Sequence, residues 1–316
     1  MLKKAYDDVS GAFDYHEGGF GSAPKFPRPV VLALLWRLKK YLAGKEEHDS
    51  NWSGEMAAKT LTAMAFGGMR DHVGGGFHRY SVDAYWHVPH YEKMLYDQAQ
   101  LIVAYLEGFQ NTGVEFYAEI AREIIAYCQR DLKHPGGAFY SAEDADSYTD
   151  DTKTKKGEGA FYVWKAEEID ALLGKDEGSI FRYGYGARRD GNARPESDPH
   201  GELKGLNTLF RAFSAKKTAE YFKLDEEKVA DIFARGRKKL FEVRAKRPRP
   251  HLDDKIITAW NGLMISALAK AASVLGDENC LKMANETAQF IFEKLSTGGK
   301  ELRRNWRDGS AEIGRA

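Results

Sequence analysis

The sequence predicts an all-α fold built from helical hairpins with short β-hairpin insertions, on two observations. Apolar residues recur at helical spacing, most regularly at Phe116, Ile120, Ile124, Cys128 and Leu132. The helix predicted over 255–275 is apolar on nearly every side, which indicates burial on more than one face. A toroid of alternating inner and outer helices produces such burial, and so does the centre of a simple bundle.

The other elements follow in chain order. Asn111-Thr-Gly113 separates two periodic segments, which should therefore fold back on each other as a hairpin. Phe139–Ser141 and Phe161–Trp164 are expected as two paired strands, with a solvated loop over 144–158 between them. No Pro-, Gly- or Ser-rich linker divides the chain, so a single domain over 1–316 is expected. Besides 91–110, 116–132 and 255–275, helices are predicted at 3–16, 29–43, 55–70, 207–222, 226–245 and 278–295.

Composition narrows the class of protein. Hydrophobic residues make up 43% of the chain and charged residues 30%, as in soluble globular proteins. Lys plus Arg equals Asp plus Glu at 47 each, so neither nucleic acid nor a membrane is expected as a partner. Cys128 and Cys280 are the only cysteines, which excludes a disulfide framework. The expected location is cytoplasmic, with an organelle matrix, or secretion after a missing N-terminal segment, as the alternatives.

The densest group of chemically active side chains lies between Gly67 and Asp97, where glycines and Pro89 interrupt the helices. Aromatic rings offer flat apolar faces to sugar C–H groups, while carboxylates, His and Arg bond to hydroxyls. The catalytic candidates in this stretch are Asp71, His78, His87, His90, Glu92 and Asp97, and the substrate-binding candidates are Arg79, Tyr80, Trp86, Tyr91 and Lys93.

Two further stretches supply candidates. Three carboxylates lie close together at Glu143, Asp144 and Asp146, and they repel one another unless an arginine, a metal or a ligand neutralises their charge. The competing interpretation is a capped, solvated turn. Asp253 lies just before a predicted helix and can simply cap it. For each of Trp86, Trp164 and Trp260, core packing is favoured over stacking on a ligand. The candidates from these regions are Asp144, Asp146 and Asp253 for catalysis, and Tyr140, Trp164, Lys255 and Trp260 for binding.

Metal, cofactor and nucleic-acid sites find little support. His87-x-x-His90-x-Glu92 has ligand types that suit zinc, but it spans a proline and fits no standard metal signature. No metal and no cofactor is therefore expected. The eight cations between Arg235 and Arg249 are expected to form the solvated face of an amphipathic helix.

Five strings of residues together resemble the spermatogenesis-associated protein 20 family. The resemblance implies a six-hairpin, glycosidase-like (α/α)6 toroid, related to sugar epimerases and hydrolases, that follows a thioredoxin-like domain. It also implies that this chain is partial and lacks both the thioredoxin-like domain and the end of the toroid. The strings are Gly18–Pro27, Gly74–Ser81, Trp86–Asp97, Tyr140–Asp146, and His251–Lys255 with Trp260–Leu263.

A carbohydrate-related function follows as the expectation, with a sugar-type ligand in the toroid pocket. Hydrolysis would use two carboxylates about 5–9.5 Å apart, whereas epimerisation would use histidines for proton transfer. The alternative is a non-catalytic binding or regulatory module that retains the pocket. The stretches around His78, His90, Asp144 and Asp253 are expected to converge at one end of the helices, and an open toroid edge is expected to favour self-association.

Overall fold

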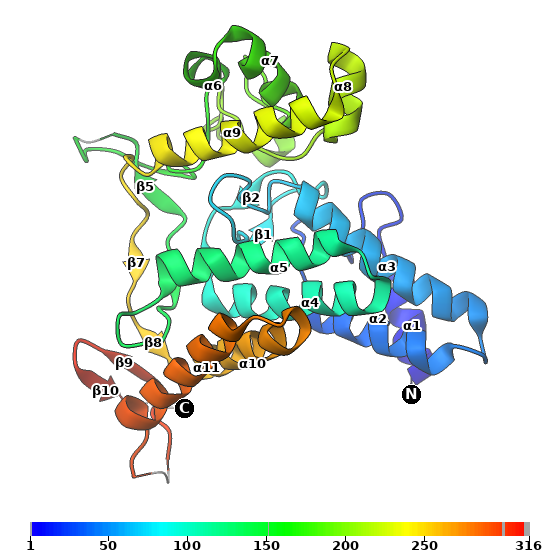
Figure 1. Cartoon of the computed structure of the whole chain (residues 1–316), viewed down its shortest axis with the longest axis vertical. Coiled ribbons are helices and arrows are strands. Elements are labelled where there is room, and N and C mark those ends of the chain that lie inside the picture. Colours follow the sequence, from blue (N-terminus) through cyan, green and yellow to red (C-terminus); the bar gives the residue numbers. More distant parts are fainter. Residues whose placement is uncertain (1, 151, 299–300, 313–316) are drawn as a thin grey trace.

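Helical hairpins form the body of the molecule. The structure is a computed structural model that describes residues 2–150, 152–298 and 301–312. Three hairpins of antiparallel helices pack side by side (Figure 1). They are α2 (Pro29–Leu42) with α3 (Glu47–Phe66), α4 (Leu95–Thr112) with α5 (Glu115–Tyr127), and α10 (Thr258–Leu275) with α11 (Glu278–Phe290).

The first helices of the three hairpins form one layer, and the second helices form another. Helix α4 packs between α2 and α10, while α3, α5 and α11 each pack chiefly against the partner in their own hairpin. This is the two-layered arc of an incomplete α/α toroid. The predicted all-α fold of hairpins with short β insertions is therefore confirmed.

Local sequence explains the sharp reversal between α4 and α5. Gly113 adopts a left-handed conformation with φ of 70° at the end of α4, a geometry that glycine reaches without steric cost. Gly108 lets α4 approach its neighbours, since a Cβ atom there would lie 2.8 Å from Leu61 Cδ1. Helix α4 is buried along most of its circumference, including Leu101, Tyr105 and Leu106. The burial on more than one face that was predicted for the helix over 255–275 is wrong for α10, which leaves one face exposed. The helix that is buried on several faces is α4.

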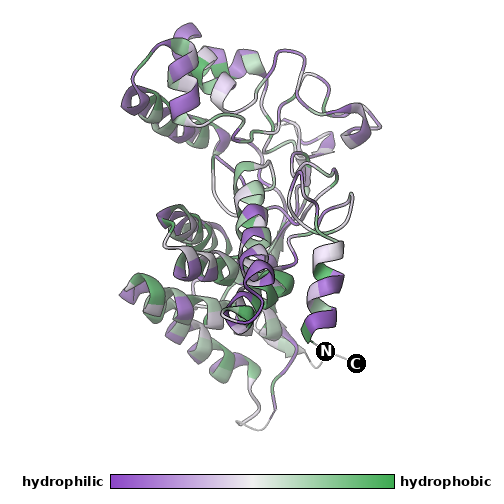
Figure 2. Ribbon diagram, turned by 90° about the vertical axis from the view of Figure 1, so that its right-hand side faces the viewer, coloured by the Kyte–Doolittle hydropathy of each residue, from purple (hydrophilic) through white to green (hydrophobic). Residues whose placement is uncertain are grey.

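A second group of helices lies between the second and third hairpins in sequence and has its own hydrophobic core. In Figure 1 this group lies above the hairpins, and the view in Figure 2 places it there as well. Phe181, Ile232 and Phe233 are buried in its core. Its members are α6 (Ala166–Leu173), α7 (Lys175–Gly184), α8 (Ala215–Phe222) and α9 (Glu226–Arg244). Outside this group, α1 (Leu2–Gly11) packs against α2 at the start of the chain.

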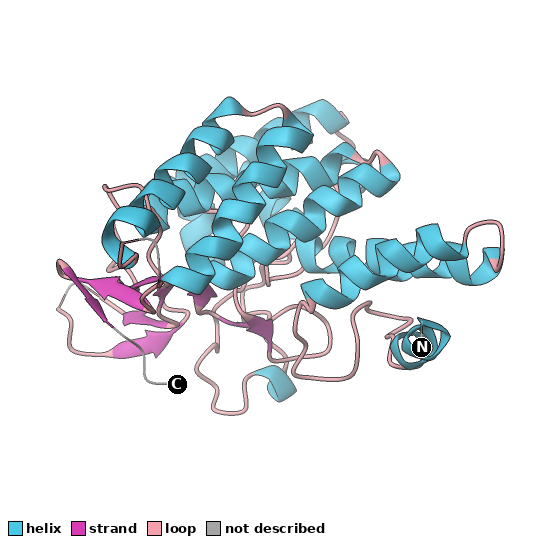
Figure 3. Ribbon diagram, turned by 90° about the horizontal axis from the view of Figure 1, so that it is seen from below, coloured by secondary structure: helices cyan, strands magenta, loops and turns pink. Residues whose placement is uncertain are grey.

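Short strands gather on one side of the helical layer (Figure 3). Two of the sheets are two-stranded: β1 with β2, and β5 with β6. The other two are three-stranded, in the orders β3-β4-β7 and β10-β9-β8, and all pairs are antiparallel. The strands are β1 (Tyr80–Ser81), β2 (Pro89–His90), β3 (Lys93–Met94), β4 (Ala142–Glu143), β5 (Asp146–Tyr148), β6 (Lys156–Glu158), β7 (Leu252–Asp253), β8 (Ile256–Ile257), β9 (Asn305–Arg307) and β10 (Ser310–Glu312).

Several local predictions were wrong. Phe161–Trp164 is not a strand, because the chain turns at Gly159, whose carbonyl accepts hydrogen bonds from the Tyr162 and Val163 amides. The expected loop over 144–158 contains the β5–β6 hairpin. Residues 207–214 are extended rather than helical, since Asn207 pairs with Trp164 and the helix begins only after the Ser214 cap. Helices α6 and α7 were not predicted, and both are short, with Gly174 between them.

Candidate functional site

Backbone pairing brings together three of the stretches that the sequence singled out. Strand β4 lies between β3 and β7, with Lys93 opposite Glu143 and Ala142 opposite Asp253. The amide of Asp144 also donates to the His251 carbonyl at 2.8 Å. Residues far apart in sequence therefore meet in one small sheet at the start of α4, which confirms the expected convergence for these segments.

A buried group of charges, here called the Asp71 cluster, lies beneath this sheet. It consists of Asp71, Lys93, Glu143 and Arg244, whose side chains are at most 4% exposed. Both Asp71 oxygens accept from Arg244 at 2.8 Å, and Lys93 Nζ donates to Oδ2 at 2.8 Å. Burial raises the pKa of Asp71, but the charges of Arg244 and Lys93 outweigh that effect and hold it well below the usual value. Asp71 is therefore ionised.

Neighbouring groups complete the bonding of the Asp71 cluster. Lys93 Nζ also donates to the Gly75 carbonyl at 2.8 Å and lies 4.3 Å from the centre of the Tyr127 ring. Glu143 accepts hydrogen bonds from Tyr127 Oη at 2.7 Å and from Arg249 at 2.6 Å. A paired, hydrogen-bonded arrangement of this kind satisfies each buried charge and fixes the surrounding loops.

Glycine is required next to the Asp71 cluster. A Cβ atom at Gly74 would lie 2.1 Å from Arg244 Nη2 and 2.9 Å from Asp71 Oδ2. The triple glycine 74–76 is therefore explained in part by the close approach of the ion pair to the backbone. It is not a phosphate-binding loop, because the Gly74 and Gly75 amides donate to Asp71 itself.

A second group of charged side chains, here called the Glu92 cluster, reaches the surface. It consists of Arg79, His90, Glu92, Asp97 and Glu158. Arg79 Nη1 donates to Glu92 at 3.0 Å, and His90 Nδ1 donates to Glu158 at 2.7 Å. The hydrogen bond to Glu158 and the carboxylate of Glu92, whose Oε2 lies 3.7 Å from His90 Nε2, raise the pKa of His90 to about 9, so that its imidazole is charged at neutral pH.

The two carboxyl groups Glu92 and Asp97 have opposite pKa shifts. His90 and the charge of Arg79 lower the pKa of Glu92. Asp97 lies in the first turn of α4 and is 8% exposed, and burial raises its pKa to about 7. Within the described part of the chain, its Oδ2 atom is buried without a hydrogen-bond partner. The pair thus combines an ionised carboxylate with a carboxyl group that holds its proton near neutral pH.

Aromatic rings border the Glu92 cluster. Tyr80 stacks on His90 at 5.0 Å and on Phe26 at 4.8 Å. Tyr96 accepts a hydrogen bond from Arg79 Nε at 3.1 Å and packs edge-on against Trp260 at 4.9 Å. The cluster is therefore flanked by partly exposed rings on both sides.

An apolar groove begins one helical turn away from these rings. Its volume is about 190 Å³, and residues of α2, α4 and α10 line it. Gln100 follows Tyr96 by one turn of α4, and Leu263 follows Trp260 by one turn of α10. Tyr96 and Trp260 therefore lie on the same helix faces as residues that line the groove.

Other predicted site residues are buried away from the Glu92 cluster. His78 is 2% exposed and donates through Nδ1 to the Tyr91 carbonyl at 2.9 Å; burial lowers its pKa to about 3, so it is neutral. Tyr91 Oη bonds to Thr208 Oγ1. His87 is 9% exposed and packs against Phe210. These side chains fill the interior between the loops.

The remaining candidates divide between core and surface. Trp86 is 1% exposed and donates to the Glu17 carbonyl at 3.1 Å, and Trp164 is fully buried in the core of the second helical group. Tyr140 packs edge-on against His134. Asp144 and Asp146 are exposed, with Asp146 opposite Glu158 in the β5–β6 hairpin, and Asp253 forms an ion pair with Lys255 at 3.1 Å.

The sequence analysis did not identify the cations that pair with the buried acidic side chains. The expectation that Arg235–Arg249 forms a solvated face is wrong for Arg244, which is 3% exposed and pairs with Asp71 across 173 positions. It is also wrong for Arg247, which donates to the Phe161 and Val163 carbonyls. The sequence feature that could have pointed to these cations is the group of neighbouring carboxylates, because such carboxylates require a positive partner. Tyr96 and Glu158 were also missed.

The fold and the site define a helical-hairpin protein of the α/α toroid type with an acidic and aromatic surface site. The chain belongs to the spermatogenesis-associated protein 20 family, which confirms the resemblance drawn from the five strings. It is 46% identical to the human protein over 297 residues and 43% identical to the mouse protein over 300 residues, or 91% and 92% of this chain. An uncharacterised Caenorhabditis elegans protein is 38% identical over 313 residues, or 96% of this chain. The chain spans 37%, 38% and 42% of the lengths of these three relatives.

Family models and solved structures give no match as strong as these relatives. No family model matches the chain. Among solved structures it is similar to a cellobiose 2-epimerase from Bacillus thermoamylovorans, with 11% identity, a TM-score of 0.36 and coverage of 99% of this chain and 93% of that one. A D-mannose isomerase gives 11% identity, a TM-score of 0.35 and coverage of 98% and 90%. Over the described residues, no helix has the length and apolar character needed to cross a membrane.

Proposed function

We propose that the Glu92 cluster binds a carbohydrate-type ligand and that Asp97 donates a proton to it. The observation that carries this proposal is the pair of carboxyl groups with opposite pKa shifts beside aromatic rings. Environments that separate two carboxyl pKa values assign one group as the acid and leave the other as an ionised carboxylate. Here Asp97 has the raised pKa and Glu92 the lowered one.

Ligand contacts would come from the groups that surround this pair. Tyr96 and Trp260 offer apolar faces to sugar C–H groups, while Arg79 and Glu92 are hydrogen-bonding partners for hydroxyls. The adjoining groove of about 190 Å³ provides an apolar wall for part of the ligand.

The charge states favour hydrolase-like chemistry over an epimerisation that depends on histidine. A histidine base must be neutral to accept a proton, but His90, with a pKa of about 9, is charged at neutral pH. His78 and His87 are neutral, but their side chains are engaged outside the Glu92 cluster, where His78 bonds to the Tyr91 carbonyl and His87 packs against Phe210. Two carboxyl groups in different protonation states instead match the acid and the base or nucleophile of glycoside cleavage.

The test is a screen of the chain against free sugars and aryl glycosides, read by thermal shift and by product release. We expect a sugar to raise the Tm, and Asp97→Asn to lower turnover about 10²- to 10⁴-fold while the ligand-induced shift persists. Asp8→Asn, an exposed change on α1, is the matched control and should alter neither quantity.

The possible outcomes separate the two functions. Stabilisation by a sugar without any turnover would support a non-catalytic binding module in place of the enzyme. Absence of stabilisation by every sugar tested would refute the carbohydrate proposal itself.

A further inference from the structure

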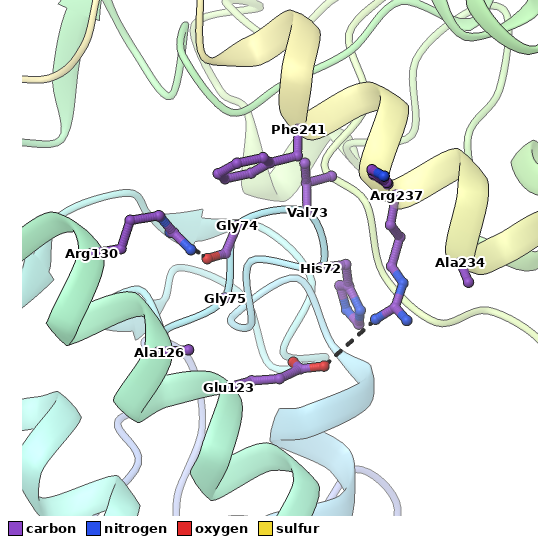
Figure 4. A pocket seen from close by; sticks show the side chains of 11 residues that line it. His72, Val73, Gly74, Gly75, Glu123, Ala126, Arg130, Ala234, Arg237 and Phe241 are labelled. Atoms are coloured by element: carbon purple, nitrogen blue, oxygen red, sulfur yellow. Dashed lines mark hydrogen bonds and ion pairs between the residues drawn. The ribbon is translucent and has the colours of Figure 1, made fainter. Parts of the chain in front are cut away.

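A pocket on the other side of the Asp71 cluster is separate from the proposed carbohydrate site. It lies between α5 and α9 above the Gly74–Gly75 loop and has a volume of about 310 Å³ (Figure 4). That volume is at the lower end of the range for small-molecule sites. None of its lining residues belongs to the Glu92 cluster.

Positive charge exceeds negative charge in this pocket. Arg130, Arg237 and Lys238 line it, and among the described residues Glu123 is the only acidic one that does so. Glu123 already has a strong partner outside the lining, because Arg70 donates to its Oε2 atom through Nε at 3.1 Å and through Nη2 at 2.6 Å. Arg70 therefore neutralises most of the Glu123 charge, and the cations that line the pocket are in excess.

Among the described residues, neither Arg237 nor Lys238 has a hydrogen-bond acceptor for its side chain. Figure 4 shows Arg237 reaching from α9 toward Glu123. The two side chains form an ion pair at 3.6 Å, a distance too long for a hydrogen bond. In the described part of the chain its Nε atom is buried without an acceptor. Lys238 is exposed and has no ion pair with any described residue. A buried guanidinium nitrogen without a partner is costly, and an anion in the pocket would remove that cost.

The rest of the wall suits a small ligand with an anionic group. Phe241 and Val73 supply apolar surface, and Arg130 is held in place by its hydrogen bond to the Gly74 carbonyl at 2.6 Å. The planar guanidinium of an arginine pairs well with phosphate oxygens, and a phosphate dianion would balance the charge of Lys238 and supply the close acceptor that Arg237 lacks among the described residues.

From these observations we infer that the pocket between α5 and α9 binds a small phosphorylated metabolite through Arg237 and Lys238. Because the two cations belong to α9 and the Gly74 loop and α5 belong to the body, the bound anion ties the second helical group to the hairpins. This inference does not depend on the proposed carbohydrate function.

Calorimetry and thermal shift test the inference with inorganic phosphate, glucose 6-phosphate and unphosphorylated glucose at constant ionic strength. We expect both phosphates to raise the Tm by about 2 °C or more at ten times their Kd, and the response to glucose to be the same in Arg237→Gln as in the wild type. Lys238→Gln and Arg237→Gln should each weaken phosphate binding about tenfold or more, since each removes a charged contact. Hydrogen exchange in α9 should slow when phosphate binds.

Lys239→Gln is the matched control, because Lys239 is adjacent, equally charged and exposed but does not line the pocket. It should change the phosphate Kd less than twofold. Equal losses in the Lys238 and Lys239 variants would overturn the inference, because they would indicate a diffuse charge effect. Stabilisation by sodium chloride equal to that by phosphate, or no binding of either phosphate, would overturn it as well.

Discussion

The ion pair between Arg244 and Asp71 joins the second helical group to the hairpins, and Arg244→Met tests its contribution. The substitution keeps much of the apolar stem but removes two charge-assisted hydrogen bonds of 2.8 Å. Asp71 would keep only Lys93 and the Val73 and Gly74 amides as partners. Removing one member of a buried ion pair costs about 3–5 kcal/mol, a large part of a typical stability of about 5–15 kcal/mol.

Urea denaturation followed by circular dichroism measures this loss. Arg235→Met is the matched control on the same helix, since Arg235 is 54% exposed and its pairs with Glu177 and Asp231 are at the surface. We expect the control to lose only a small fraction of what Arg244→Met loses. Limited proteolysis should also cut near α9 first in the Arg244 variant. Equal losses of unfolding free energy in the two variants would refute the claim that the buried pair holds α9 in place.

Two further predictions concern pH and the surface. The pKa of His90 is raised from 6.5 to about 9, so the stabilisation that its charge provides is complete below pH 6.5 and is lost as the pH rises through 9. In His90→Gln, this fall in the free energy of unfolding, on the order of 1–2 kcal/mol, should be absent from urea titrations at pH 6 and pH 9.5. Identical pH profiles of the variant and the wild type would contradict the assignment. Val30 is 73% and Leu263 41% exposed at the apolar groove, so the chain should self-associate and bind a hydrophobic dye. Leu263→Glu should weaken the association about tenfold or more in analytical ultracentrifugation. A wild-type monomer that binds no dye would contradict this prediction.

Much of the helical architecture was determined by local sequence. The bounds of α2 and α9 agree with the predicted 29–43 and 226–245 to within a residue, because periodic apolar positions and Pro29 act over one or two turns. The hairpin of α4 and α5 follows from Gly113 in the same way. Each of these features depends on neighbours within a few positions along the chain.

Predictions failed where a segment takes its structure from distant parts of the chain. Residues 207–214 were predicted as part of a helix, but Asn207 bonds to Trp164 and is held extended. Strand β4 exists because β3 and β7 lie on either side of it. Backbone hydrogen bonds to partners far away in sequence override a local preference that amounts to less than about 1 kcal/mol per residue.

The candidate site shows the same division. The sequence by itself identified Glu92, Asp97 and Trp260 by residue type and by their loop and helix-start positions. Only the tertiary structure decided that Asp97 is buried enough to hold its proton and that Glu92 is kept ionised by His90 and Arg79. It also decided that Arg244, one cation among eight in a polar segment, is the buried partner of Asp71. Burial and charge pairing depend on which side chains meet in space, and spacing along the chain does not specify that when the partners are 173 residues apart.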